Sequence, residues 1–214
     1  MTKKQRAAEC VRLLEEKYPG AVCSLESQNA LQLLIATRLS AQCIDARVNM
    51  VTPELFKRFP DVYAFASADV KEVEELIKSC GLYRTKAKSI VDMCRVIIDR
   101  FDGEVPGTLE DLVQLPGVGR KTANLVMGDI YGYPAVVADT HCIRISGRLG
   151  LCDSTDPYKV EMQLKGILNP EKSNDFCHRL VLFGREICTA RSPKCDICPL
   201  FGVCAGAGKY KDKN

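Results

Sequence analysis

The sequence predicts an all-α protein. Apolar residues recur at helical spacing in one segment after another, and glycine or proline separates the segments. Strand-like alternation is absent apart from a doubtful run at 135–138. The chain has 214 residues, which is enough for one good core or two small ones.

The first half predicts five helices. Residues 7–20 place apolar side chains on one face and stop at Pro19-Gly20. Residues 29–42 are apolar on nearly every side, which predicts a buried central helix. The other three segments cover 67–81 with Ser67 as cap and Gly81 as terminator, 88–101, and a short helix at 108–115 capped by Thr108 with Asp111 at the capping-box position. In the second half, helices are predicted in 139–150, 157–168 and 171–188, and the last nine residues are expected to form a frayed basic tail.

The sequence predicts a protein of a reducing compartment. No apolar run is long enough to span a membrane, and the N-terminus lacks a secretory h-region, so a cytoplasmic location is expected, with nucleoid association in a bacterium. The 12 cysteines are therefore expected to be metal ligands or buried thiols rather than disulfides. The net charge of +3 permits a polyanionic partner without requiring one.

Four cysteines, at 188, 195, 198 and 204, lie in one short loop with the spacing C-x6-C-x2-C-x5-C. Thiolates suit either zinc or an iron–sulfur cluster. Zinc ribbons usually offer two C-x2-C knuckles, and only one occurs here, so the spacing favours a cluster and leaves zinc as the alternative. The remaining cysteines are predicted to be buried apolar thiols: Cys10, Cys23, Cys43, Cys80, Cys94, Cys142, Cys152 and Cys177.

A glycine turn at 115–123, LPGVGRKTA, predicts a phosphate site. Gly117 and Gly119 allow positive φ and a close backbone approach, and the next helix should begin near Arg120 with unpaired N–H groups. Such a helix end attracts phosphate, and Arg120 and Thr122 could add contacts. The alternative is a plain turn between helices.

Lys121 and Asp139 form the candidate catalytic pair. A lysine at a positive helix end beside Arg120 is expected to lose its proton more easily than a free lysine, so Lys121 is either a nucleophile that forms a Schiff base with a sugar or a simple phosphate contact. A carboxylate is needed to steady the positive charge that develops on the sugar. Asp139 is the candidate; alternatively, or in addition, it caps the helix that it heads.

Together these motifs resemble the endonuclease III family of helix-hairpin-helix DNA glycosylases. The resemblance rests on the segments 39–45, 81–87, 115–124 and 138–144 and on the four-cysteine loop, and it extends along nearly the whole chain. It implies two helical domains that bind DNA in a cleft between them. One is a helical barrel at 22–132 with its hairpin at about 108–131; the other joins 1–21 to 133–214 and carries a [4Fe-4S] cluster held by Cys188, Cys195, Cys198 and Cys204.

The resemblance also implies an activity and its residues. The enzyme would remove oxidised pyrimidines from double-stranded DNA and nick the abasic site by β-elimination, working as a monomer with no membrane partner. Lys121 resembles the Schiff-base nucleophile and Asp139 its carboxylate partner, facing each other across the cleft. Gln42 resembles the residue that fills the gap left by the flipped base, and Leu82 resembles a wedge in the opposite stack. The alternatives are structural roles: a solvated helix end for Gln42 and a core leucine for Leu82.

Further candidates are accessory. Asp45, His141 and Arg144 lie inside the matching motifs, Arg191 and Lys194 could reach phosphate from the cysteine loop, and His178 is expected to be structural. Two other functions stay open: a lyase that acts only on abasic sites, and a DNA-binding module without catalysis. The related adenine-removing glycosylases fit less well, because they lack the lysine and carry a glutamate where this chain has Thr37.

Overall fold

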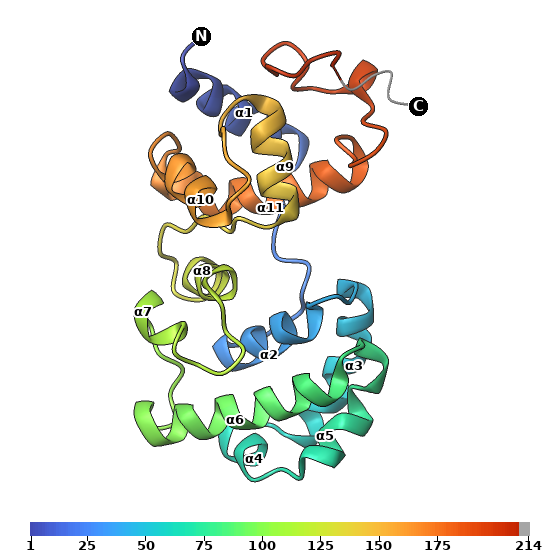
Figure 1. Ribbon diagram of the computed structural model, residues 1–214, viewed down its shortest axis with the longest axis vertical. Helices are drawn as coiled ribbons and strands as arrows, with labels where there is room; N and C mark the ends of the chain where they lie inside the picture. The colour runs from blue at the N-terminus through green and yellow to red at the C-terminus, as the bar shows by residue number, and fades with distance from the viewer. Residues whose placement is uncertain (210–214) are drawn as a thin grey trace. The chain divides into compact units, whose positions relative to one another are not determined.

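The computed structural model describes residues 1–209, and within them every regular element is a helix (Figure 1). The all-α prediction is therefore confirmed. The described chain divides into two compact units, residues 1–22 with 133–209 (unit 1) and residues 23–132 (unit 2). The expected basic tail falls mostly on residues 210–214, outside the described residues. A search of the described helices finds none that is long and apolar enough to cross a membrane.

Unit 2 is built around the predicted central helix, α2, in which six residues between Leu33 and Leu39 are buried. Helices α3, α6 and α8 pack against α2, and α4 and α5 pack against α6. The long helix α6 buries an apolar stripe that includes Ile90, Cys94 and Ile97. The elements of unit 2 are α2 (Ala30–Ser40), α3 (Asp45–Arg58), α4 (Val62–Ala66), α5 (Val70–Leu76), the 3-10 turn η1 (Lys78–Cys80), α6 (Tyr83–Phe101), α7 (Leu109–Leu112) and α8 (Arg120–Asp129).

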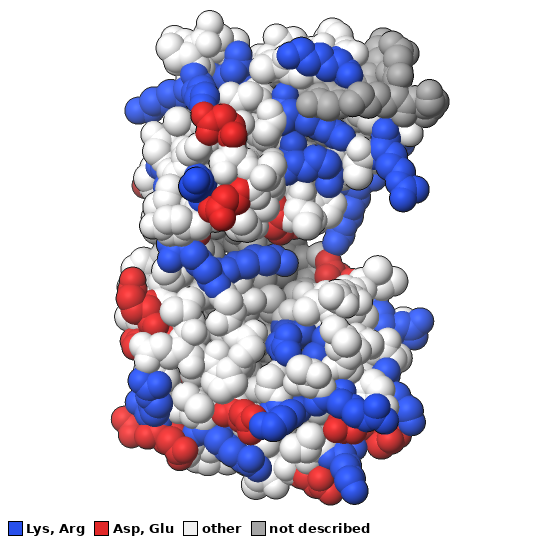
Figure 2. Space-filling model, viewed as in Figure 1, with Lys and Arg blue, Asp and Glu red and all other residues white. Residues whose placement is uncertain are grey.

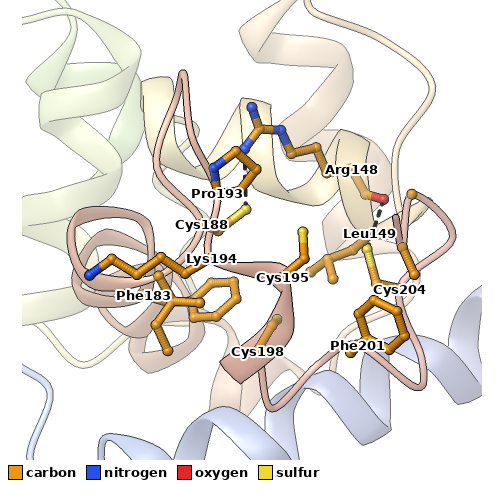
Figure 3. A pocket seen from close by; sticks show the side chains of 13 residues that line it. Arg148, Leu149, Phe183, Cys188, Pro193, Lys194, Cys195, Cys198, Phe201 and Cys204 are labelled. Carbon is orange, nitrogen blue, oxygen red and sulfur yellow. Dashed lines mark hydrogen bonds between the residues drawn. The ribbon is translucent and has the colours of Figure 1, made fainter. Parts of the chain in front are cut away.

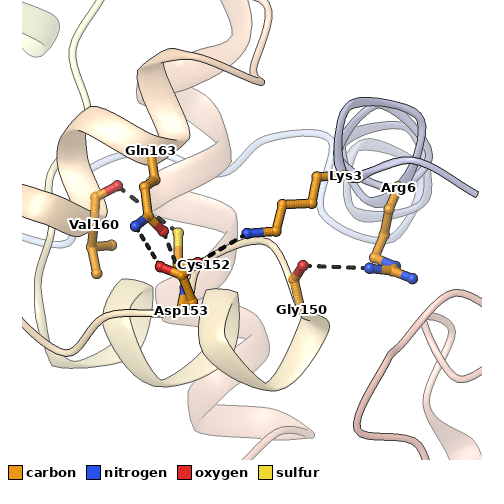
Figure 4. Close-up of polar contacts among 7 residues, drawn as sticks. All are labelled: Lys3, Arg6, Gly150, Cys152, Asp153, Val160 and Gln163. Atoms are coloured by element: carbon orange, nitrogen blue, oxygen red, sulfur yellow. Dashed lines mark hydrogen bonds and ion pairs between the residues drawn. The ribbon is translucent and has the colours of Figure 1, made fainter.

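Unit 1 joins the N-terminal helix to the C-terminal half of the chain. Its elements are α1 (Lys3–Lys17), α9 (Thr140–Leu149), α10 (Pro157–Lys165), α11 (Pro170–Glu186) and the 3-10 turn η2 (Cys195–Ile197). Helix α11 packs against both α1 and α9. Polar contacts tie α1 to the segment after α9: Lys3 binds Asp153 at 3.4 Å, and Arg6 donates to the Gly150 carbonyl at 3.4 Å (Figure 4). Segments far apart in the sequence thus share one core.

The structure corrects two local predictions and adds two helices. Ser67 does not start a helix; it is the C-cap of α4. Helix α5 starts three residues later, at Val70, where the carboxylate of the N-cap Asp69 accepts a hydrogen bond from the Lys71 amide at 3.0 Å. Residues 135–138 are buried but form no strand. Helices α3 and α4 were not singled out from the sequence, in part because Pro53 interrupts the pattern inside α3.

Candidate active site and cluster loop

The glycine turn forms a helical hairpin in unit 2. Thr108 caps α7, accepting a hydrogen bond from the Asp111 amide at 3.2 Å and donating to its carboxylate at 2.7 Å. Gly119 is the N-cap of α8, with no side chain to cap the first N–H groups. The helix start predicted near Arg120 is therefore present, and its first-turn amides offer the donors that a phosphate would use.

The two glycines serve different purposes. Gly117 has φ +79, and a Cβ there would lie 2.9 Å from Arg38 Nε and 3.1 Å from Ser89 Oγ, so both its conformation and its surroundings require glycine. Gly119 has φ −95, and a Cβ there would meet nothing within 4 Å. Positive φ, expected for both glycines, is used only at Gly117; Gly119 instead leaves open space in front of the helix end.

Lys121 lies in the first turn of α8, and it is exposed. The two residues after Thr122, Ala123 and Asn124, are buried, and the Asn124 side chain donates to the Arg120 carbonyl at 3.2 Å. The helix is thus anchored directly behind the lysine. An exposed amine on a fixed helix end is geometrically suited to approach a ligand bound at the hairpin.

Gln42 and Leu82 share an unusual backbone conformation. Gln42 has φ +56 and Leu82 has φ +47, and in the described residues only Asp102 joins them as a non-glycine residue with positive φ. This conformation is strained for residues with a Cβ and often marks functional sites. Leu82 is 58% exposed, so the alternative of a core leucine is wrong. Gln42 is also exposed, in the loop between α2 and α3.

Asp139 is the N-cap of α9 in unit 1, the helix that the sequence predicted it to head. Its Oδ1 accepts a hydrogen bond from the Cys142 amide at 2.7 Å, and His141 Nδ1 lies 3.4 Å from its Oδ2. His141 is thus placed to orient the carboxylate. Because Lys121 and Asp139 belong to different units, their expected approach to each other stays a prediction.

The other accessory candidates have structural contacts. Arg144 donates to the carbonyls of Cys188 at 3.0 Å and Gly184 at 3.5 Å, which links α9 to the start of the cysteine loop. Asp45, the first residue of α3, accepts a hydrogen bond from Ser24 at 2.5 Å. His178 is 9% exposed on α11, as expected of a structural histidine.

The four cysteines of the cluster loop (residues 188–204) line one cavity together with Arg148, Leu149 and Phe183 (Figure 3). Arg148 fixes the loop with donated hydrogen bonds to the Thr189 and Ala190 carbonyls, both at 2.7 Å, and to the Cys188 thiol at 3.4 Å. This role has no local sequence signal, because Arg148 lies 40 residues before the loop that it holds.

The thiol arrangement fits a cluster better than a single ion. A tetrahedral zinc site holds four ligands around one ion, with sulfurs at about 2.3 Å. Four thiols spread around a common cavity suit a cubane, in which each thiolate binds a different iron. Burial raises the pKa of Cys198 to about 11, and iron, which binds the thiolate form, would offset this cost when bound.

Basic residues accompany this loop. Arg191 and Lys194 are both exposed. In the space-filling view, Lys and Arg side chains gather on the side of unit 1 drawn at the right (Figure 2). This distribution suits a polyanion better than the net charge of +3 alone suggests.

The other cysteines follow the prediction in part. Six are buried free thiols, and burial is the main reason that the pKa of Cys94 rises to about 12. Cys23 and Cys43 are only partly buried, which corrects the prediction for these two. Cys43 lies in the loop of Gln42 rather than on an apolar helix face.

Comparisons with known proteins agree with this geometry. Residues 35–170 match the model of the HhH-GPD superfamily base excision DNA repair protein, and residues 188–204 match the iron-sulfur binding domain of endonuclease III. The chain is 49% identical to endonuclease III of Synechocystis over 96% of its length and 94% of that protein's. It is 42% identical to the Bacillus subtilis endonuclease III, covering 95% and 93%.

Solved structures give the same result. A trapped covalent intermediate of endonuclease III with DNA, the estranged-adenine complex, matches with a TM-score of 0.91 and 42% identity, covering 98% of this chain and 99% of that one. A thermostable thymine-DNA glycosylase shares the fold at 22% identity, with a TM-score of 0.86 over 96% and 98% of the two chains. Fold and hairpin thus define a base-excision DNA repair protein of the helix-hairpin-helix class.

Within that class, the chain belongs to the endonuclease III family. It is a DNA glycosylase with AP lyase activity, it acts on DNA, and it carries a [4Fe-4S] cluster.

Proposed function

We propose that Lys121 is the nucleophile of both the glycosylase and the lyase step, acting on oxidised pyrimidines in double-stranded DNA. The observation that carries this proposal is the exposed position of Lys121 in the first turn of α8, directly behind the hairpin. The trapped covalent intermediate of the 42% identical relative supports it, since such an intermediate requires a protein nucleophile.

The proposed reaction begins when the base leaves the stack. A base inside a duplex cannot be reached, and a damaged base costs least to flip. Gln42 would fill the gap, and Leu82 would enter the opposite stack. The N–H groups and side chains at Gly117, Gly119, Arg120 and Thr122 would hold the phosphates of the distorted strand without reading its sequence.

The covalent step follows from the two proposed catalytic residues. The neutral Lys121 amine attacks C1′ as the glycosidic C–N bond breaks, and the base leaves with a proton. Asp139 stabilises the positive charge on the sugar. The nitrogen lone pair then opens the ring to an imine, which acidifies the C2′ proton. Loss of this proton breaks the C3′–O bond and releases the 3′ phosphate, and water regenerates the lysine.

We also propose that Cys188, Cys195, Cys198 and Cys204 are the four cluster ligands. Their shared cavity and their spacing support this set. When bound, the cluster supplies a rigid centre for the loop. The protein's own contribution is the set of hydrogen bonds from Arg148 and Arg144, which hold the loop backbone. Exposed Arg191 and Lys194 would then face DNA phosphates.

Borohydride trapping tests the proposal. Wild-type protein incubated with duplex DNA that holds thymine glycol should form a covalent adduct on reduction and should release the base. Lys121→Gln should reduce the adduct to background. Lys71→Gln, an exposed lysine in α5 of the same unit, is the matched control and should trap like wild type.

Two results would overturn the proposal. An undiminished adduct with Lys121→Gln would exclude Lys121 as the nucleophile. Cleavage of preformed abasic sites without release of thymine glycol would reduce the function to a lyase. We further propose that the protein acts as a monomer in the cytoplasm, as the bacterial source of its relatives suggests; size-exclusion chromatography with DNA tests the monomer.

A further inference from the structure

Lys86 is a buried lysine that the reaction described above does not use. It is 1% exposed, in the first turn and a half of α6, and its ammonium donates to the carbonyls of Leu39 at 2.8 Å and Cys80 at 2.5 Å. It lies four residues before Ile90 and eight before Cys94, on the apolar stripe of the helix. Burying an amine is costly unless it is well bonded, so an apolar side chain would be the simpler choice at this position.

The two carbonyls belong to the two segments that carry the strained residues. Leu39 is in the last turn of α2, three residues before Gln42. Cys80 ends η1, two residues before Leu82. Carbonyls at helix ends lack partners within the helix and favour a cation. The Lys86 ammonium therefore fixes the backbone just before Gln42 and just before Leu82.

The segments also lie close to each other. A Cβ at Gly81 would lie 4.0 Å from the Gln42 carbonyl oxygen. Burial, followed by the neighbouring Cys43 thiol, raises the pKa of Cys80 to about 11. The Gln42 loop (residues 41–44) and the Leu82 turn (residues 81 and 82) are thus adjacent, and Lys86 lies beneath both.

The hairpin is held one turn further along α6 by different residues. Arg38 Nε donates to Ser89 Oγ at 2.7 Å and lies under Gly117. The hydrogen bonds of the Lys86 ammonium go to Leu39 and Cys80, outside the hairpin, so its removal should affect the Gln42 loop and the Leu82 turn more than the helix end that presents Lys121.

We propose that Lys86 is a positioning residue for base flipping, which acts by holding Gln42 and Leu82 in their left-handed conformations. This inference rests on the proposed DNA contacts of those two residues. It predicts a selective defect: release of a base from duplex DNA needs both segments, whereas cleavage of a preformed abasic site in single-stranded DNA needs Lys121 but has no base to flip and no opposite stack.

The test compares Lys86→Met with Lys88→Gln, an exposed lysine on the same helix. Both are assayed well below their melting temperatures. Lys86→Met should slow single-turnover release of thymine glycol from duplex DNA by roughly ten- to a hundredfold, because small misplacements have effects of that size. Cleavage of the single-stranded abasic site should stay within about threefold of wild type, and Lys88→Gln should match wild type in both assays. Equal loss in both assays would overturn the inference.

A double-mutant cycle separates positioning from general destabilisation. If Lys86 acts through Leu82, then Lys86→Met should add little to the defect of Leu82→Ala. Fully additive defects would contradict the inference while leaving the proposed role of Leu82 intact. Unchanged base release in both Gln42→Ala and Leu82→Ala would instead refute the proposed DNA contacts themselves. Should Lys86→Met fail to fold, Lys86→Gln, which keeps one donor group, enters the same cycle.

Discussion

The hairpin of unit 2 and the cluster loop of unit 1 hold their candidate residues by different means. The hairpin is set by helices and by one required glycine, Gly117, packed over Arg38 and Ser89. The cluster loop contains a single 3-10 turn, and hydrogen bonds from Arg148 and Arg144 to its backbone hold it in place. The hairpin is therefore preorganised by the protein's own core, whereas the loop is completed by a cofactor. Substitutions in the two regions should therefore have different effects on activity, stability and cofactor content.

Beyond Lys121 itself, Asp139 should give the largest effect, because its expected role is chemical. Asparagine caps a helix about as well as aspartate, so Asp139→Asn should fold normally. Base release should fall by about 10²- to 10³-fold, since the charge on the sugar loses its partner. Rapid-quench assays of base release measure this loss.

The matched control is Asp156→Asn, which replaces the capping carboxylate of α10 in the same unit. It should leave base release unchanged. A similar stability for both variants, with a defect in only one, would separate catalysis from capping; equal activity would show that Asp139 is only a cap.

Removing one proposed cluster ligand should cause loss of the cluster and destabilise unit 1 without destabilising unit 2. Cys198→Ala should lose most of its iron and acid-labile sulfide, and unit 1 should melt at a lower temperature because metal binding contributes directly to folding. Metal analysis and circular dichroism measure both changes. Cys94→Ala, which removes a buried thiol from unit 2, should keep its iron. Full iron content in Cys198→Ala would contradict the ligand set.

Substitution of the two hairpin glycines by alanine should affect different properties: stability for Gly117 and DNA binding for Gly119. Gly117→Ala should destabilise the protein by about 1–3 kcal/mol, because alanine is strained at positive φ and its Cβ would crowd Arg38. Gly119→Ala should change stability by less than about 0.5 kcal/mol yet weaken DNA binding, since its Cβ would occupy the space in front of the helix end. Urea titrations and anisotropy measure the pair. Unchanged binding with Gly119→Ala would argue for a plain turn.

The smallest effect is expected from the basic side chains of the cluster loop. Replacing Arg191 and Lys194 together by glutamine should reduce the salt dependence of DNA binding by about one unit of slope for each lost phosphate contact. Lesion preference should stay the same, because phosphate contacts carry no sequence information. Lys159→Gln, an exposed lysine on α10, serves as control. An altered lesion preference would show that the loop reads the base.

The sequence predicted most helices, the hairpin and the four-cysteine loop, because these depend on local patterns such as apolar spacing, glycines and cysteine intervals. It could not predict contacts between distant segments. Lys86 lies in register with the apolar stripe of α6, but the predicted helix began only at residue 88, two residues after it. Its partners, Leu39 and Cys80, are fixed only by tertiary packing. Arg148 is a similar case, and the positive φ of Gln42 and Leu82 has no local sequence signal.

The central claim is that Lys121 forms the covalent bond with the abasic sugar. In the most direct test, wild-type protein reacts with thymine glycol DNA in the presence of borohydride, which reduces the imine to a stable adduct. The adduct is then digested, and mass spectrometry locates the modified residue. The account predicts the sugar remnant on the peptide that contains Lys121 and on no other lysine. A remnant on another residue, such as buried Lys86, or an adduct that survives in Lys121→Gln, would contradict it.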